Sequence, residues 1–418
     1  MDAAASVDGM SAENIAIYRE NDFKVYIASR FFSTTAMMVQ SVAVGWQIYD
    51  IVRDPLALGL VGLSEFLPMF LLTLPAGEIS DRFDQRKVLA ISLAVEALCS
   101  ALLLFLSFAH PQNAWPFYAV MVLFGSARAF SGPASQSLLP FLVPSERLPK
   151  AIAWGSSAFQ VAVIGGPALG GFLYALGPFG AYSACLVCFL AAAFGTMTLG
   201  GRRRSGPPPS GTRLERVKEG VRFVRARPVV LGAISLDLFA VLLGGATALL
   251  PVFARDILLV GPAGLGVLRS SPAVGAALTA FFLTRYPIER DTGTKMFVAV
   301  AIFGIATIIF GVSTNFYLSL VALAVLGASD QISVFVRSAL IQYATPDEMR
   351  GRVSAVNMLF IGASNELGEF ESGVTASFFG TVPAVVIGGI GTLLIVVIWM
   401  RLFPPLRTVD RLRDVEAR

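Results

Sequence analysis

Ionisable side chains stand inside long apolar stretches of this 418-residue chain. A charge that faces lipid at the centre of a helix costs roughly 2.5 to 3.5 kcal/mol, so each of these residues must pair or border water. The set comprises Arg30, Glu65, Glu96, Arg128, Asp237, Arg269, Asp330, Arg337, Glu366, Glu369 and Glu371. A carboxyl group in a partly dehydrated cavity can hold a proton and release it when a cation or water approaches. The sequence therefore predicts a cavity in which protons are bound and released.

Helical spacing selects among these residues, because side chains three or four positions apart share a face of a helix. One stripe carries Gly362, Asn365, Glu366, Glu369 and Gly373, whereas Glu371 points to the opposite side. Similar faces carry Asp330, Ser333 and Arg337 in a second segment, and Arg128, Ser131, Gly132 and Ser135 in a third. We expect these faces to line the cavity. The first candidates for the proton carrier are Glu366 and Glu369, followed by Asp330, Asp237 and Glu65. The alternative is that the acids of the first stripe have only a structural role, as ion-pair partners of Arg128 or Arg337.

The segments that must position these residues are membrane spans. The chain is 55% hydrophobic and only 14% charged, whereas soluble domains carry about 25% charged residues. A bilayer core of ~30 Å needs about 20 apolar residues per helix. Twelve such runs occur, at residues 24–49, 56–80, 88–108, 115–142, 151–176, 178–199, 229–254, 261–284, 295–312, 316–343, 352–379 and 381–402. The composition thus predicts an all-α integral membrane protein with twelve transmembrane helices.

The distribution of Lys and Arg predicts the orientation of these spans, because short cytoplasmic segments hold most basic residues. With the N-terminus inside, Arg53 and Arg255 are the only basic residues in outer loops. We therefore expect a multi-pass protein of the cell (inner) membrane with both termini cytoplasmic. The expected organisation is a tail (1–23), a six-helix bundle (24–200), a linker with an amphipathic helix (201–228), a second six-helix bundle (229–403) and a tail (404–418).

An internal repeat relates the two bundles. At one fixed shift, Gly125, Leu138, Pro144, Glu146, Ala153, Gly166 and Gly171 meet Gly327, Leu340, Pro346, Glu348, Ala355, Gly368 and Gly373. At a slightly larger shift, Pro55, Leu58 and Gly59 meet Pro262, Leu265 and Gly266. Duplicated six-helix halves related by an axis along the membrane normal, with a site near the midplane, are typical of secondary transporters.

The same repeat places base opposite acid twice, Arg128 opposite Asp330 and Arg30 opposite Asp237. Either these pairs attract across the axis when the cavity narrows, or each charge pairs within its own half.

Two motifs carry a resemblance to a known family. The segment Gly77-Glu-Ile-Ser-Asp-Arg-Phe-Asp-Gln-Arg-Lys87 resembles the G-x-x-x-D-R-x-G-R-K signature of the major facilitator superfamily, with Asp84 at its glycine position. The segment Gly166-Pro-Ala-Leu-Gly-Gly171 is similar to the exporter signature of that superfamily's antiporters. The runs Arg128-Ala-Phe-Ser-Gly-Pro133 and Arg350-Gly-Arg-Val353 resemble the branch of drug and macrolide effluxers and the enterobactin exporter.

The resemblance implies a fold and roles for these residues. It implies a major facilitator fold, a cytoplasmic gate and a helix-packing exporter motif. The gate would comprise Gly77, Asp81, Arg82 and Arg86, and the exporter motif Gly166, Pro167, Gly170 and Gly171. Because glycine alone adopts positive φ freely, Asp84 could alter the turn of the gate loop.

We therefore expect a proton-coupled exporter, an antiporter, of amphipathic small molecules such as drugs or siderophores, working as a monomer by alternating access. We expect no metal, cofactor or nucleic acid. An uptake symporter, a lipid or lysolipid flippase and a metal exporter of the same fold remain alternatives. No phosphate loop supports ATP-driven transport, and one peripheral histidine cannot supply the catalytic set of a membrane enzyme.

Overall fold

The computed structural model describes residues 12–109, 111–200 and 213–411, and all regular structure in these ranges is helical. The first half contains α1 (Ala12–Val52), α2 (Pro55–Arg82), α3 (Gln85–Ala109), α4 (Trp115–Leu142), α5 (Leu148–Ala175) and α6 (Pro178–Thr198). The second half contains α8 (Pro228–Leu243), α9 (Leu250–Val252), α10 (Gly261–Arg285), α11 (Thr292–Val312), α12 (Phe316–Ala344), α13 (Asp347–Phe379), α14 (Thr381–Leu402) and α15 (Pro404–Arg407). The helix α7 (Arg213–Ala226) lies between the halves in sequence.

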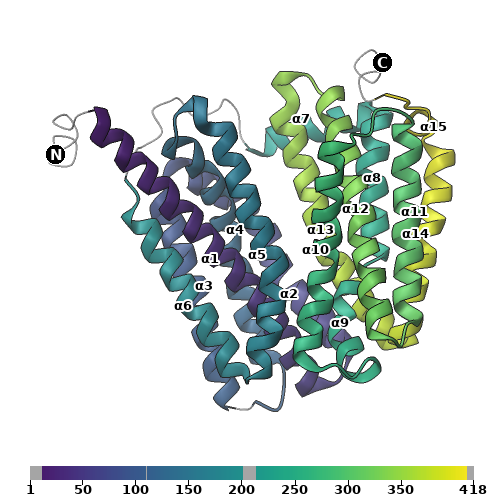
Figure 1. Cartoon of the computed structure of the whole chain (residues 1–418), viewed down its shortest axis with the longest axis horizontal. Coiled ribbons are helices and arrows are strands. Elements are labelled where there is room, and N and C mark those ends of the chain that lie inside the picture. Colours follow the sequence, from purple (N-terminus) through teal and green to yellow (C-terminus); the bar gives the residue numbers. More distant parts are fainter. Residues whose placement is uncertain (1–11, 110, 201–212, 412–418) are drawn as a thin grey trace.

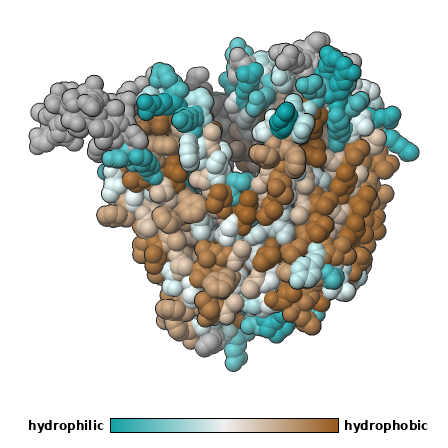
Figure 2. Space-filling model, viewed as in Figure 1, coloured by the Kyte–Doolittle hydropathy of each residue, from teal (hydrophilic) through white to brown (hydrophobic). Residues whose placement is uncertain are grey.

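The predicted all-α integral membrane fold is confirmed. Among the described helices, nine are long and apolar enough to cross a membrane. The remaining long helices, α1, α4 and α13, have 41, 28 and 33 residues, which is ample length for a span. They carry many of the polar residues that the sequence assigns to a cavity. Figure 2 shows hydrophobic side chains covering the sides of the molecule and hydrophilic ones gathered at its two ends.

The helix boundaries differ from the expected spans in two places. The helix α1 begins at Ala12, well before the expected start of the first span at residue 24, so part of the expected tail is helical. The seventh span is interrupted, because α8 ends at Leu243 and is followed by a short 3-10 turn (Ala246–Leu249), α9 and a π-helical turn (Phe253–Ile257). Consecutive glycines, Gly244 and Gly245, mark the interruption, and such turns often occur at functional positions.

The two halves separate at one end of the molecule and meet at the other (Figure 1). The ends of the described chain, Ala12 and Arg411, lie on the side where the halves separate, which we call the open end. At the opposite end, the closed end, α2 packs against α13 and α5 packs against α10. The halves are therefore joined by two helix pairs at the closed end.

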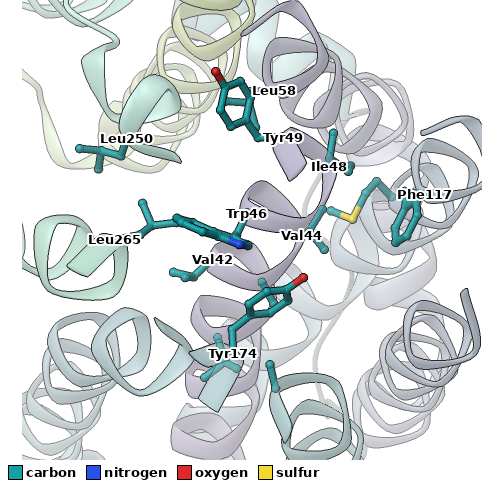
Figure 3. Close-up of a cluster of buried hydrophobic side chains, with 14 of the residues drawn as sticks. Val42, Val44, Trp46, Ile48, Tyr49, Leu58, Phe117, Tyr174, Leu250 and Leu265 are labelled. Atoms are coloured by element: carbon teal, nitrogen blue, oxygen red, sulfur yellow. The ribbon is translucent and has the colours of Figure 1, made fainter. Parts of the chain in front are cut away.

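A large hydrophobic core includes residues from both halves, several of which are drawn in Figure 3. Val42 and Trp46 of α1 pack in one cluster with Leu250 of α9 and Leu265 of α10. Leu250 and Leu265 are fully buried. Removing apolar surface from water is favourable by ~25 cal/mol per Å². Burial of these side chains therefore stabilises the contact between the halves where water would otherwise reach it.

Candidate functional site

A cavity of about 890 Å³ lies between the halves towards the open end. Its walls come from α1 to α6, from the first half of α13, as far as Ala363, and from Val217 of α7. Figure 2 shows the molecule hollowed between its halves at this end. The lining combines aromatic and methionine side chains, such as Phe66, Met69 and Met358, with charged groups, such as Arg30 and Glu96. Cavities of this size and mixed lining are typical of sites for small molecules.

Three ionisable residues of the first half lie at or beside this cavity: Arg128 and Glu96 line it, and Glu65 contacts Arg128. The guanidinium of Arg128 on α4 forms an ion pair with Glu65 on α2. Ser131, one turn further along α4, donates a hydrogen bond of 2.9 Å to Oε1 of Glu96 on α3. Glu96 is 4% exposed, so its carboxyl group is almost wholly removed from solvent. The predicted stripe on α4 thus faces the cavity and holds two acids from neighbouring helices.

The acids of α13 approach the same place from the second half. A Cβ placed on Gly62 of α2 would lie 3.2 Å from Oε2 of Glu369 and 3.7 Å from Oε2 of Glu366. These acids therefore cross the interface towards α2, one turn from Glu65. Glu369 also lies 4.0 Å from Arg269 of α10. Glu366 lies close enough to Arg128 and Glu65 to interact with them electrostatically.

These residues form one group, which we call the interface cluster: Glu65, Glu96, Arg128, Arg269, Glu366 and Glu369. It contains four carboxyl groups and only two guanidinium groups, so it carries a surplus of two negative charges when all are ionised. Uncompensated charge in a poorly solvated site is costly, so the surplus must be neutralised by protons or other cations.

The remaining residues of the predicted site lie elsewhere. Arg30 lines the cavity nearer the open end, with its guanidinium 5.9 Å from the ring centroid of Phe159. Asn365 has an exposed side chain and does not line the cavity, although it belongs to the same predicted stripe as Glu366. Asp237 and Asp330 border a separate small cavity inside the second half, and Arg337 lies beside them.

Two of the charges that the repeat matches, Arg128 and Asp237, pair within their own halves. Arg128 pairs with Glu65, and Arg337 of α12 pairs with Asp237 of α8. Among the described residues, no ion pair joins Arg128 to Asp330 or Arg30 to Asp237, and of these four charges only Arg128 and Asp237 have an ion-pair partner within their own half. Glu371 bonds within its own helix, to Thr375 at 2.7 Å, as expected for a residue on the face away from the stripe.

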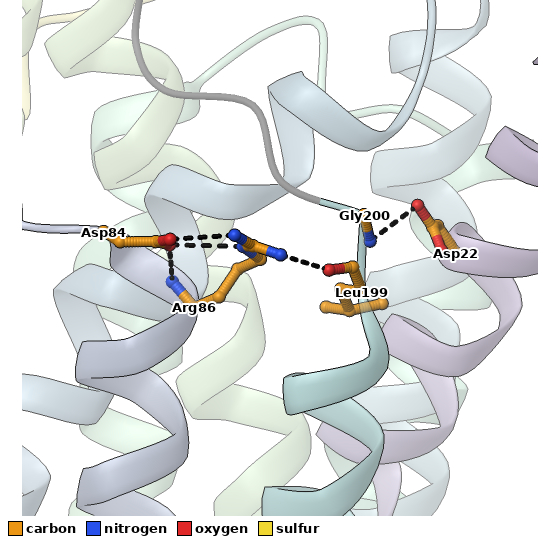
Figure 4. A network of polar contacts seen from close by, with 5 residues as sticks. All are labelled: Asp22, Asp84, Arg86, Leu199 and Gly200. Atoms are coloured by element: carbon orange, nitrogen blue, oxygen red, sulfur yellow. Dashed lines mark hydrogen bonds and ion pairs between the residues drawn. The ribbon is translucent and has the colours of Figure 1, made fainter. Parts of the chain in front are cut away.

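The loop between α2 and α3 is anchored to its own half (Figure 4). The carboxylate of Asp84 accepts hydrogen bonds from the backbone N–H of Arg86 (3.0 Å) and from its Nε (3.2 Å), and Nη2 lies 2.8 Å away. Arg86 also donates to the carbonyl of Leu199 at the end of α6. Asp22 of α1 accepts a hydrogen bond of 3.0 Å from the N–H of Gly200. The loop therefore ties α3 to the end of α6, and Asp22 ties α1 to the same end of α6.

Asp84 takes the place of glycine without adopting a left-handed conformation. The described non-glycine residues with positive φ are Arg53, Leu259 and Asp291. Asp84 instead caps the first turn of α3. Burial raises the pKa of Asp84, but its hydrogen bonds from Arg86 outweigh that effect and hold the pKa below the ordinary value.

Of the other residues in the predicted gate, Gly77 is buried in α2 and Arg82 is exposed at its end. The side chain of Asp81 lies outside the described residues.

The predicted exporter motif lies where helix backbones come closest. A Cβ on Gly166 would lie 2.5 Å from Cβ of Met38, and one on Gly170 would lie 2.9 Å from Cα of Val39, so both glycines seat α5 on α1. On another face of α5, a Cβ on Gly171 would lie 2.4 Å from the carbonyl oxygen of Pro262 in α10. The motif therefore joins α5 both to its own half and to the second half.

A charged network that the sequence analysis did not single out lies at the closed end. Asp50 pairs with Arg53 of its own helix region at 3.6 Å and with Arg255 of the second half. Asp256, next to Arg255, lies 3.4 Å from Arg53 and accepts a hydrogen bond from Tyr49. We call these residues the closed-end network: Tyr49, Asp50, Arg53, Arg255 and Asp256. The signal in the sequence was present, because Arg53 and Arg255 are the two basic residues in expected outer loops, and each has an acidic neighbour.

Comparison with known proteins identifies relatives over most of the chain. A family model described as transmembrane secretion effector matches residues 12–416. The chain is 23% identical over 372 residues to macrolide efflux protein A of Streptococcus pyogenes, covering 84% of this chain and 89% of that protein. It is 24% identical over 397 residues to enterobactin exporter EntS of Shigella dysenteriae, covering 92% of each chain. It is 22% identical over 382 residues to the staphyloferrin A transporter of Staphylococcus aureus, covering 90% and 95%.

Solved structures share the fold at low sequence identity. A bacterial homologue of the human lysosomal transporter Spinster, in an inward-facing and unoccupied conformation, superposes with a TM-score of 0.69 at 14% identity, covering 96% of this chain and 98% of that one. The nucleoside transporter NupG superposes with a TM-score of 0.67 at 15% identity, covering 92% and 99%.

Proposed function

Because this chain belongs to the transmembrane secretion effector family of major facilitator transporters, we propose that it is a proton-coupled exporter of amphipathic small molecules. The family comprises membrane transporters and not enzymes, as the sequence predicts. We place both termini in the cytoplasm of a cell whose inner membrane holds the protein as a monomer. The open end is then the cytoplasmic side, and the cavity takes up its substrate from there.

The observation that carries the proton coupling is the charge surplus of the interface cluster. The cluster has four carboxyl groups and two guanidinium groups. Glu96 and Arg128 line the cavity, while Glu366 and Glu369 lie on the seam that joins α13 to α2. When the halves separate at the closed end, this seam becomes accessible to the outer medium. The same carboxyl groups can then take up protons from outside and release them inside. A molecule that binds in the cavity beside Arg128 changes the balance that keeps those protons bound.

The lining favours amphipathic substrates. Phe66, Met69 and Met358 offer adaptable apolar contacts, while Glu96 and Arg128 supply charge at one end of the cavity. The named macrolide, enterobactin and staphyloferrin transporters among the relatives also point to export of molecules of this kind.

Transport in purified proteoliposomes tests the proposal. With an imposed pH gradient, a macrolide such as erythromycin and a catecholate siderophore serve as probes, and the proton flux is followed with an internal pH dye. We expect substrate movement opposite to proton movement, with the coupling lost in Glu366→Gln and Glu369→Gln. The matched control is Glu371→Gln on the same helix, since Glu371 bonds to Thr375 and faces away from the cluster.

Three outcomes contradict the proposal. Proton flux in the same direction as the substrate, compared in right-side-out and inverted vesicles, identifies an uptake symporter. Coupled flux that survives both Gln substitutions removes the assigned role of the α13 acids. Movement of a fluorescent lysolipid in place of either probe identifies a flippase.

A further inference from the structure

A second, smaller cavity lies inside the second half, between α8, α11 and α12. Its volume is about 10 Å³, close to what a single water molecule needs. The lining consists of Asp237, Ala240, Val241, Val300, Phe303, Ser329, Asp330 and Ser333. None of these residues lines the large cavity, so the two spaces have separate walls. This small cavity, which we call the α8–α12 pocket, is not used by the proposed transport cycle.

The charges around this pocket do not balance. Asp237 and Arg337 form an ion pair in which the side chains are 7% and 2% exposed. Within the described part of the chain, the carboxylate of Asp330 forms no ion pair and no hydrogen bond. The lining residues of α11, Val300 and Phe303, carry no charge. On α10, which packs against α12, Arg269 is engaged with Glu369. The pocket therefore has a net charge of minus one when its acids are ionised.

A buried hydroxyl group faces the pocket without a hydrogen-bond partner. Ser333 is 2% exposed, and in the described structure its Oγ makes no hydrogen bond. The neighbouring Ser329 behaves differently, because its Oγ bonds to the carbonyls of Val325 and Leu326 at 2.9 Å each. Buried polar atoms are rarely left unpaired, so the unpartnered oxygen of Ser333 beside the carboxylates offers a position where a polar ligand can bind.

We propose that the α8–α12 pocket binds one small monovalent cation, and that Na⁺ fits it. Oxygen atoms of Asp237, Asp330 and Ser333 supply hard ligands of the kind that such ions prefer. One positive charge brings the site to neutrality, whereas a divalent ion leaves it with a net positive charge in a poorly solvated interior. The small volume favours Na⁺ over the larger K⁺. Bound there, the ion links α8 to α12 and stabilises the packing of the second half.

Thermal unfolding of the purified full-length protein in detergent tests this site without any transport assay. At constant pH and constant ionic strength, choline chloride is replaced stepwise by NaCl or by KCl. Because a ligand that binds only the folded state stabilises it by mass action, we expect Na⁺ to raise the Tm by several degrees in a saturable way, with a much smaller effect of K⁺.

Substitutions locate the ion. Asp330→Asn and Ser333→Ala should each abolish the Na⁺-dependent rise in Tm, and Ser333→Ala is the gentler change should Asp330→Asn fold poorly. Glu366→Gln, in the interface cluster, should keep it. Equilibrium binding of ²²Na⁺ to the same proteins gives an independent readout with one site expected per chain. Either the absence of a saturable effect specific to Na⁺ in the unsubstituted protein, or a Na⁺ effect that persists in both pocket variants, overturns the proposal.

Discussion

Gly171 of α5 lies directly against Gly266 of α10, so that a Cβ on Gly171 would come within 2.8 Å of Cα of Gly266. The same relationship recurs on the other side of the molecule, where a Cβ on Gly373 of α13 would lie 2.8 Å from Cα of Gly59 in α2. The sequence repeat matches Gly59 with Gly266 and Gly171 with Gly373. The two contacts are therefore equivalent under the pseudo-twofold axis, and the same glycine–glycine helix contact occurs twice at the closed end.

Alanine at Gly171 should weaken the closed end. The added methyl group meets backbone atoms of α10 that cannot move aside, and overpacking of this kind costs about 1 to 3 kcal/mol. We expect Gly171→Ala to shift the population towards separation at the closed end, seen as a longer distance between spin labels placed on α5 and α10. Gly165→Ala on the same helix is the control, because a Cβ there meets nothing within 4 Å. An unchanged distance distribution in Gly171→Ala would show that the contact does not restrain the halves.

Asp50→Asn should loosen the closed-end network. It removes the carboxylate that pairs with both Arg53 and Arg255. Because the side chains of Asp50 and Arg53 are about half exposed, we expect an effect of at most ~1 kcal/mol, which falls as salt is raised. A Cβ on Gly45 would lie 3.4 Å from Pro251 of the second half. The rate at which maleimide labels a cysteine in place of Gly45 therefore reports opening of the closed end.

That labelling rate should rise about fivefold at low salt in Asp50→Asn, in line with ~1 kcal/mol. Asp54→Asn serves as the control, because Asp54 caps α2 through the N–H of Leu56 and is not part of the network. Equal rates in the two variants would exclude a restraining role for Asp50.

Arg128→Ala should lower the stability of the protein more than removal of both charges of the Arg128–Glu65 ion pair does. It leaves Glu65 and Glu96 without their cation, and breaking a poorly solvated ion pair from one side costs roughly 3 to 5 kcal/mol. The double variant Arg128→Ala with Glu65→Gln should recover much of the lost thermal stability. A double-mutant cycle on Tm and on unfolding in denaturant measures the coupling. Strictly additive effects would mean that the two side chains do not depend on each other.

The Asp84 capping contact predicts a pH dependence of stability. Because folding lowers the pKa of Asp84, the contact stabilises the protein above the ordinary carboxyl range and is lost as the pH falls through the lowered value. We expect hydrogen exchange at the first turn of α3 to quicken on acidification. In Asp84→Asn, which cannot form the ion pair with Arg86, this exchange should be faster at neutral pH and should vary less with pH. Full protection of the α3 amides in Asp84→Asn at neutral pH would contradict the assignment.

Much of the architecture follows from the sequence by itself. Apolar runs of about 20 residues leave the chain few alternatives to membrane-spanning helices, because every backbone polar group in lipid must be paired within its own segment. The spacing of Gly166 and Gly170 predicts a close contact between helix backbones, and the repeat matches Gly171 with Gly373. Helical periodicity alone puts Glu366 and Glu369 on one face and Glu371 on another.

The tertiary structure decides which charges meet. Periodicity assigns Arg128 and Glu369 to helix faces, but only the packing of α2, α4 and α13 brings them to one seam with Glu65. The sequence treats Asp237, Asp330 and Arg337 like the other intramembrane charges, whereas the fold encloses them in a separate pocket. Likewise Asp50 and Arg255 meet only because the halves close at that end. Local patterns reflect the surroundings of a residue along its own helix, while the partner of a charge depends on how helices distant in sequence are arranged in space.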